Sequence, residues 1–118
     1  MDKIDIFGYR YIKGYDTISK YLIVEIKRDK AGIDVLNQVM KYVDWVNQDY
    51  SFGDYSMIEA FIVARDFDKD VLYNVNKLCV RNYIKGRRPV ILEVWKNIRL
   101  IRYKYINGDL KFEEVDLS

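Results

Sequence analysis

Near the start of the sequence lie two carboxylates that could bind a metal ion and a lysine that could act beside it. Asp5 lies in a segment of alternating apolar residues, and Glu25 and Lys27 lie in a second, more continuously apolar segment. On a strand Glu25 and Lys27 would project from one face, because side chains alternate with a period of two. If the two segments pair, Asp5 lies across from them. The repulsion between the carboxylates is then relieved by a hard cation such as Mg²⁺ or Mn²⁺, which can polarise a phosphate and lower the pKa of a bound water.

The same residue types also have simpler explanations. A Glu-x-Lys pattern on a strand is often a surface ion pair, and it is the apolar setting of Glu25 and Lys27 that favours a functional role. Gln38 and Tyr42 are four residues apart on a predicted helix and therefore share a face. That face could contact nucleic acid, or it could be an ordinary half-exposed helix surface. The residues alone leave both alternatives open.

The composition of the 118-residue chain excludes several classes of enzyme. It contains no histidine, which rules out Ser-His-Asp and Cys-His relays and HExxH zinc proteases. A single cysteine, Cys79, can form neither a Cys-rich zinc site nor an internal disulfide, so we expect a reducing compartment, the cytoplasm. There is no long apolar run and no signal peptide pattern, so we expect no membrane association.

The periodicity of apolar residues predicts the elements that would position these groups. The patterns at 3–13 and 21–27 predict two strands that pair as a hairpin. The later patterns predict, in order, a helix at 29–47, a strand at 57–64, a helix at 69–79 capped by Asp66 or Asp68, a strand at 89–95, and a hairpin of 98–106 and 110–115 around Asn107-Gly108. This order favours one domain, residues 1–118, with a mixed α/β sheet and helices packed on it.

The net charge of +2 does not by itself indicate a nucleic-acid partner, because such binding depends on local clustering. Six basic residues could form a rim for phosphate contacts or could equally be solvated charges: Arg28, Lys30, Arg81, Lys85, Arg87 and Arg88.

Asp5, the Glu-Ile-Lys triplet at 25–27 and the helix face that follows together resemble the PD-(D/E)xK nuclease superfamily. Residues 24–32 and 38–45 are similar to the nuclease domain of the NucS/EndoMS-like endonucleases, in which a VELKRGKAG-like strand end leads into a QxxxYxxW-like helix. The resemblance covers residues 3–47. It implies a restriction-endonuclease-like fold, a mixed β-sheet core flanked by helices, here with an appended C-terminal β-hairpin at 98–115.

The resemblance also implies a function and roles for individual residues. Asp5, Glu25 and the carbonyl of Ile26 would hold Mg²⁺ or Mn²⁺, and Lys27 would be the catalytic lysine. The implied activity is a metal-dependent endonuclease that hydrolyses DNA phosphodiester bonds through a metal-activated water. Gln38, Tyr42, Arg28 and Lys30 would support the site or contact DNA.

Two alternatives to an active endonuclease remain open. One is a nuclease-like module that binds nucleic acid or protein without cleaving, and the other is a structural dimerisation domain. The family usually has further elements before the residue equivalent to Asp5. We therefore expect the chain to act as a homodimer or as part of a longer chain, since its first strand would otherwise leave an open sheet edge.

Overall fold

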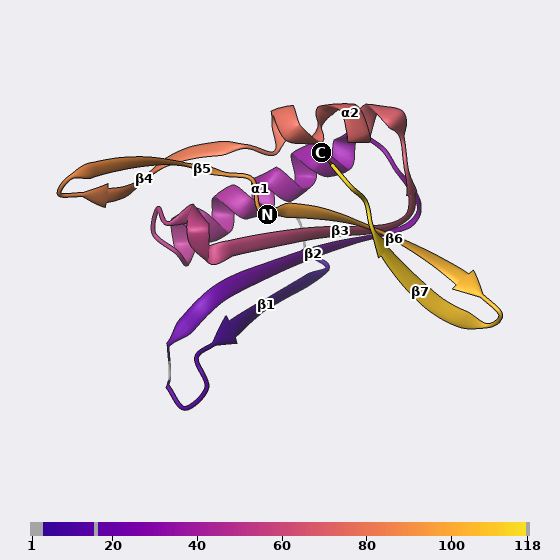
Figure 1. Cartoon of the computed structure of the whole chain (residues 1–118), viewed down its shortest axis with the longest axis horizontal. Helices are drawn as coiled ribbons and strands as arrows, with labels where there is room; N and C mark the ends of the chain where they lie inside the picture. The colour runs from indigo at the N-terminus through magenta and orange to yellow at the C-terminus, as the bar shows by residue number, and fades with distance from the viewer. Residues whose placement is uncertain (1–3, 16, 118) are drawn as a thin grey trace.

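The chain forms one curled β-sheet with both helices on the same face, and a two-stranded hairpin projects from one end (Figure 1). The computed structural model describes residues 4–15 and 17–117, so the first residue of the predicted strand at 3–13 lies outside the described residues. The elements in chain order are β1 (Ile6–Tyr11), β2 (Ile18–Ala31), α1 (Asp34–Asp49), the 3₁₀ turn η1 (Tyr55–Met57), β3 (Ile58–Phe67), α2 (Lys69–Leu78), β4 (Arg81–Arg87), β5 (Val90–Trp95), β6 (Ile98–Ile106) and β7 (Asp109–Glu114).

The sheet topology confirms the predicted mixed α/β class. The strand order is β1-β2-β3-β6-β7, with β2, β3 and β6 parallel to one another and the outer strands β1 and β7 antiparallel to their neighbours. The predicted pairing of the first two strands is confirmed. Parallel neighbours need a crossover connection, and here α1 and α2 provide it on the way from β2 to β3 and from β3 to β6.

The core lies between the sheet and α1. Alternate residues of β2 and β3 are buried on the helix side, as the strand period of two requires, and α1 covers them with an apolar stripe. The buried members of this layer are Tyr21, Ile23, Ile58, Ala60, Ile62, Ala64, Val35, Leu36, Val39, Val43 and Val46. Glu25 occupies the next position after Ile23 in the same alternation, so its carboxylate projects into the helix-covered face.

Strand β2 is longer than predicted, and α1 begins later. The predicted strand ended at 27 and the predicted helix began at 29, whereas Lys30 and Ala31 still pair with Asp66 and Phe67 of β3. The polar run at 28–30 shows no apolar alternation, so only the pairing with β3 keeps it in the sheet. The site residues therefore lie in the middle of a strand rather than near its end.

A further strand replaces the predicted basic stretch. Arg81–Arg87 forms β4, which pairs antiparallel with β5 in a separate two-stranded sheet.

The predicted hairpin around Asn107-Gly108 is confirmed: both residues have positive φ values, 52° and 81°, and β6 and β7 pair on either side of them. The hairpin is not isolated, because the first half of β6 pairs with β3 in the main sheet. No helix within residues 4–15 and 17–117 is long and apolar enough to cross a membrane.

Candidate functional site

The β1–β2 hairpin brings Asp5 and Glu25 together. The register pairs Ile6 with Val24, which places Asp5, one residue before Ile6, across from Glu25. Oδ2 of Asp5 accepts a hydrogen bond of 2.8 Å from the backbone N–H of Ile26. This bond fixes the Asp5 side chain against β2, just before the first residue of β1. The two residues, called the carboxylate pair below, thus form the cluster that their positions in the sequence predicted.

The carboxylate of Glu25 is buried and has a raised pKa. Its side chain is buried, with 3% of the residue exposed, and among the described residues its Oε2 has no hydrogen-bond partner. Burial, followed by the charge and hydrogen bonding of Asp5, raises the pKa of Glu25 to about 7, and the positive charge of Lys27 opposes this rise. A buried carboxylate oxygen without a donor is costly, and a bound cation is one of the few groups that can satisfy it.

Lys27 and the carbonyl of Ile26 lie beside the carboxylate pair. Lys27 projects from the same face of β2 as Glu25 and is half-buried, close enough for its charge to lower the pKa of that carboxylate. Within a strand the N–H and C=O of one residue point to the same side. Because the N–H of Ile26 points to Asp5, its carbonyl also points toward the side where Asp5 lies.

Gln38 and Tyr42 act as one unit on α1. Nε2 of Gln38 donates a hydrogen bond of 2.9 Å to the hydroxyl oxygen of Tyr42, and Tyr42 is completely buried. The predicted pairing of these two side chains on one helix face is therefore correct. The bond fixes the orientation of the Gln38 amide, whose oxygen can still accept a hydrogen bond.

The position of Gln38 relative to the sheet follows from the packing of Trp45. Trp45 packs against Phe7 of β1 with ring centroids 6.2 Å apart, so this flank of α1 faces the β1–β2 hairpin. Gln38 lies on the same flank, about 10 Å toward the helix N-terminus. Trp45 lies near Phe7, and Phe7 pairs with Ile23 of β2. Because α1 runs antiparallel to β2, a residue nearer the N-terminus of α1 lies beside a later residue of β2 (Figure 1). Gln38 is therefore displaced from Ile23 in the direction of Glu25.

The predicted basic rim is divided between two ends of the molecule. The end of β2, which carries Arg28 and Lys30, and the β4–β5 hairpin lie at opposite ends of the sheet (Figure 1). Lys30 forms an ion pair with Asp68 at 3.4 Å. Nε and Nη2 of Arg81 donate hydrogen bonds of 2.8 and 2.9 Å to the two carboxylate oxygens of Asp44 on α1, so Arg81 is a structural residue. The side chain of Arg87 lies outside the described part of the chain.

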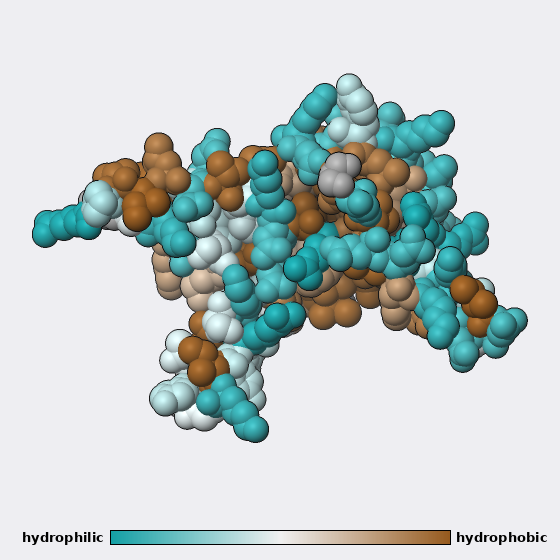
Figure 2. All heavy atoms as spheres, viewed as in Figure 1, coloured by the Kyte–Doolittle hydropathy of each residue, from teal (hydrophilic) through white to brown (hydrophobic). Residues whose placement is uncertain are grey.

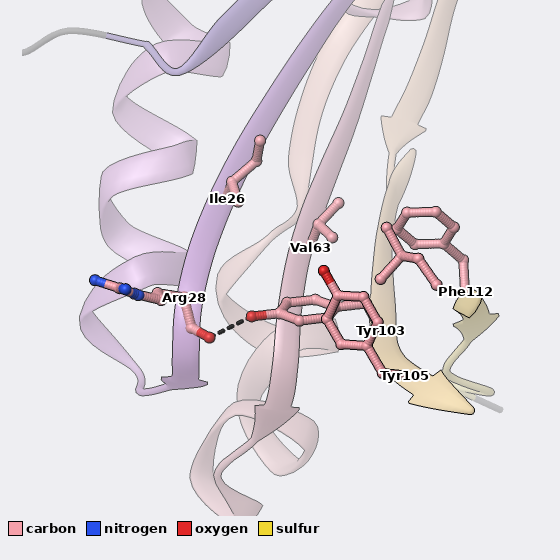
Figure 3. Close-up of a pocket in the computed structure, with 7 residues that line it drawn as sticks. Ile26, Arg28, Val63, Tyr103, Tyr105 and Phe112 are labelled. Atoms are coloured by element: carbon pink, nitrogen blue, oxygen red, sulfur yellow. Dashed lines mark hydrogen bonds between the residues drawn. The ribbon is translucent and has the colours of Figure 1, made fainter. Parts of the chain in front are cut away.

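The face of β2 opposite Glu25 is an open groove that sequence reasoning missed. It has a volume of about 470 Å³, and Ile26, Val63, Tyr105 and Phe112 contribute to its walls (Figure 3). The hydroxyl of Tyr103 reaches across β3 and donates a hydrogen bond to the carbonyl oxygen of Arg28. The signal for this groove in the sequence is the nearly continuous apolar run at 21–27, which is typical of a strand covered on both faces, whereas the helices cover one face.

Within the described residues, no group of three or more His, Cys, Asp or Glu side chains comes together. The acidic residue Glu59, which is also buried in a strand, is accounted for by an ion pair with Arg10 at 3.7 Å. The carboxylate pair, with the Ile26 carbonyl and Lys27 beside it, is thus the arrangement in this part of the chain best suited to bind a divalent cation.

Comparison with known families gives an independent result. A family model described as the endonuclease NucS C-terminal domain matches residues 4–81, which is more than half of the chain. The match begins just before Asp5, includes both helices and ends at the first residue of β4, so the β4–β5 hairpin, β6 and β7 lie outside it apart from that residue. No curated protein and no solved structure matches the chain. The chain belongs to the endonuclease NucS C-terminal domain family.

Proposed function

We propose that this domain is a metal-dependent endonuclease that hydrolyses DNA phosphodiester bonds at the carboxylate pair. The observation that carries the proposal is the buried carboxylate of Glu25, which lies against Asp5 and has an oxygen without a hydrogen-bond partner among the described residues. A stable core gains nothing from such a pair, because both burial and like charge penalise it. A divalent cation would turn the same arrangement into a favourable one.

The residues fit Mg²⁺ or Mn²⁺. Both are hard cations that prefer oxygen ligands, and Mg²⁺ is commonly bound through one or two carboxylates together with substrate phosphate. Asp5, Glu25 and the carbonyl of Ile26 would hold the ion. When bound, the cation would polarise the phosphodiester and lower the pKa of a water molecule near it.

The remaining site residues would position the substrate. Lys27 would donate to a phosphate oxygen and balance the negative charge that develops there, since it projects from the same face as Glu25. Gln38, held by Tyr42, would offer its amide oxygen to the same region. Arg28 and Lys30 continue along β2 and would contact neighbouring phosphates.

An aspartate on one strand and Glu-x-Lys on its neighbour correspond to the PD-(D/E)xK pattern, and we assign the domain to that superfamily with a restriction-endonuclease-like core. The partner is DNA. A homodimer, or a longer chain that contains this domain, would cover β1, an edge strand whose Tyr9 and Tyr11 are exposed by 58% and 62%. Such a protein would act in the cytoplasm.

The cleavage test uses two site variants and two matched controls. With Mg²⁺ or Mn²⁺ and duplex, single-stranded and branched DNA, we expect Glu25→Gln and Lys27→Met to lower the cleavage rate at least about 100-fold. Glu114→Gln and Lys111→Met make the same chemical changes at exposed positions of β7 and should cleave like the wild type. If the wild type leaves all three substrates intact, or if the control variants lose as much activity, the endonuclease proposal is wrong.

One observation favours a second candidate, a module that binds DNA or a protein without cleaving. Among the described residues the carboxylate pair has no third acidic partner. Titration of Mn²⁺ followed by calorimetry separates the two candidates. DNA binding that persists in EDTA, together with no Mn²⁺ uptake that depends on Glu25, would favour the module without cleavage.

A further inference from the structure

The β4–β5 hairpin, residues 81–95, is firmly anchored at its base and is called the arm below. At the start of β4, Arg81 forms its two-bond contact with Asp44, and at the end of β5 the indole N–H of Trp95 donates a hydrogen bond of 2.9 Å to the carbonyl of Ile58. The anchoring points lie on α1 and at the start of β3, so both strands of the arm leave the body from a rigid base.

Beyond this base most of the described residues of the arm are exposed, and residues 84–86 line an open pocket together with residues 52–54. The arm is a two-stranded sheet of its own and projects from one end of the molecule, with hydrophobic residues over its surface (Figures 1 and 2). Four aliphatic side chains are at least half exposed on it: Ile84 (55%), Val90 (62%), Leu92 (76%) and Val94 (50%). Ile84 lies opposite Leu92, and Val90, Leu92 and Val94 alternate along β5, so one face of the ribbon is aliphatic. An exposed apolar face of this kind marks an interaction surface.

The arm carries a net positive charge. Residues 81–95 contain four basic residues and one acidic residue, which gives them a formal charge of +3, and because the whole chain carries +2 the remaining residues carry −1. Two of the basic residues, Lys85 and Arg88, are exposed near the tip. Lys85 lies at a register shift between Ile84 and Gly86, where the pairing with β5 is interrupted.

We infer that the arm binds duplex DNA by placing its two-stranded tip in a groove of the double helix. The major groove is about 12 Å wide and admits a two-stranded β-ribbon, so the shape of the arm fits it. Lys85 and Arg88 would contact the phosphates at the groove edge, and the aliphatic face would contact thymine methyl groups. The inference rests on the proposed function in its choice of DNA as the partner.

Charge decides against a second copy of the chain as the occupant. Two copies that met through their arms would bring the exposed cations Lys85 and Arg88 of each copy together, and like-charge contacts across an interface are unfavourable. A polyanion has the complementary charge. The family match ends at Arg81, so the rest of the arm lies outside the matched region.

The test measures binding of a short fluorescein-labelled duplex by anisotropy in EDTA, across a series of salt concentrations. We expect the double variant Lys85→Gln/Arg88→Gln to weaken binding about tenfold and to reduce the slope of log K against log salt by about 2. The control Lys69→Gln/Lys77→Gln removes the same charge from exposed positions of α2 and should change affinity by less than about twofold. Leu92→Ser should weaken binding while the salt slope stays unchanged, because it removes no cation.

Several results would overturn the inference. Equal losses in the two double variants would show that overall charge, not the arm, determines binding. Unchanged duplex affinity in the arm variants would show that the arm does not bind DNA. If the variants alter only self-association, measured by light scattering, the partner of the arm is a second copy of the chain. If they alter only binding to phosphatidylserine vesicles, the partner is a membrane surface. Because EDTA removes any need for cleavage, this result is independent of the proposed nuclease activity. If the arm binds DNA but the protein cleaves none, the inference about the arm is supported and the endonuclease proposal is wrong.

Discussion

Glu25 is the residue at which stability and proposed function conflict. It is buried in the same layer as Ile23 and Ile62, and it lies against the carboxylate of Asp5. The folded protein therefore holds the proton of Glu25 more tightly than the unfolded chain does, with a pKa of about 7 against the usual value of 4.5. When the folded state holds a proton more tightly than the unfolded state, stability is greatest below the unfolded pKa and falls as the pH rises through the folded pKa.

The first prediction concerns this pH dependence in the absence of metal. In EDTA, raising the pH from about 5 to about 8 should lower the free energy of unfolding of the wild type by as much as about 3 kcal/mol more than that of Glu25→Gln, because the glutamine does not ionise. Urea denaturation at both pH values measures the difference, and Glu114→Gln, at an exposed position, should behave like the wild type. Identical pH dependence in the wild type and Glu25→Gln would show that Glu25 ionises as freely as a solvated side chain.

The second prediction concerns metal addition near pH 8. Mg²⁺ at a concentration of about 100 times its dissociation constant should stabilise the wild type by about 3 kcal/mol, because a ligand that binds only the folded state shifts the unfolding equilibrium. Asp5→Asn and Glu25→Gln should lose most of this effect, and thermal unfolding with and without the ion measures it. If Mg²⁺ stabilises both variants as much as the wild type, the ion binds elsewhere.

At the scale of the elements, the sequence predicted those that depend on local residue patterns better than those that depend on a partner strand. Asn107-Gly108 specified the β6–β7 turn because both residues accept positive φ, and the apolar stripe of α1 predicted a helix. The end of β2 is polar and β4 is mostly polar or basic, and both are strands because β3 and β5 supply their hydrogen-bond partners. Such tertiary pairing is not encoded in local periodicity.

The candidate site likewise has parts that the sequence predicted and parts that it could not predict. The position of Asp5 on one strand and of Glu25 on the next predicted that they meet, since the hairpin is a local structure. The complete burial of Tyr42 and the uncovered groove beside Ile26 could not be predicted, because both depend on which face of the sheet the helices cover. Sequence patterns identify a two-faced strand but do not say whether each face has a partner within the chain.

The third prediction concerns the base of the arm. Arg81→Met should destabilise the protein by about 1 kcal/mol, since it removes both hydrogen bonds from Arg81 to the half-buried Asp44, which keeps the bond from the Tyr55 hydroxyl. The larger effect should be local, because the base of the arm is loosened. Amide hydrogen exchange in β5 should become faster, and duplex binding should weaken by more than the loss of one positive charge explains. Arg99→Met breaks an exposed pair with Glu114 at 3.6 Å and should change stability by less than about 0.5 kcal/mol. Equal exchange in β5 for both variants would show that Arg81 does not hold the arm.

At the scale of the whole molecule, the arm and the C-terminal hairpin extend the chain in opposite directions, with the carboxylate pair on the sheet that joins them (Figure 1). The longest dimension is 53 Å. The body carries a slightly negative charge and the arm a positive one, so a polyanion would meet the arm first. The arm would then hold the duplex beside the sheet that carries the carboxylate pair.

The fourth prediction follows from these dimensions. Duplex DNA rises about 3.4 Å per base pair, so a single copy of a molecule 53 Å long can contact at most about 15 base pairs. Affinity measured in EDTA should therefore rise with duplex length and level off at or below about 15 base pairs. For Lys85→Gln/Arg88→Gln it should level off at a shorter length, because the contacts at one end are lost. A plateau at about twice this length would mean that two copies share one duplex, and an equal plateau in wild type and variant would place the DNA away from the arm.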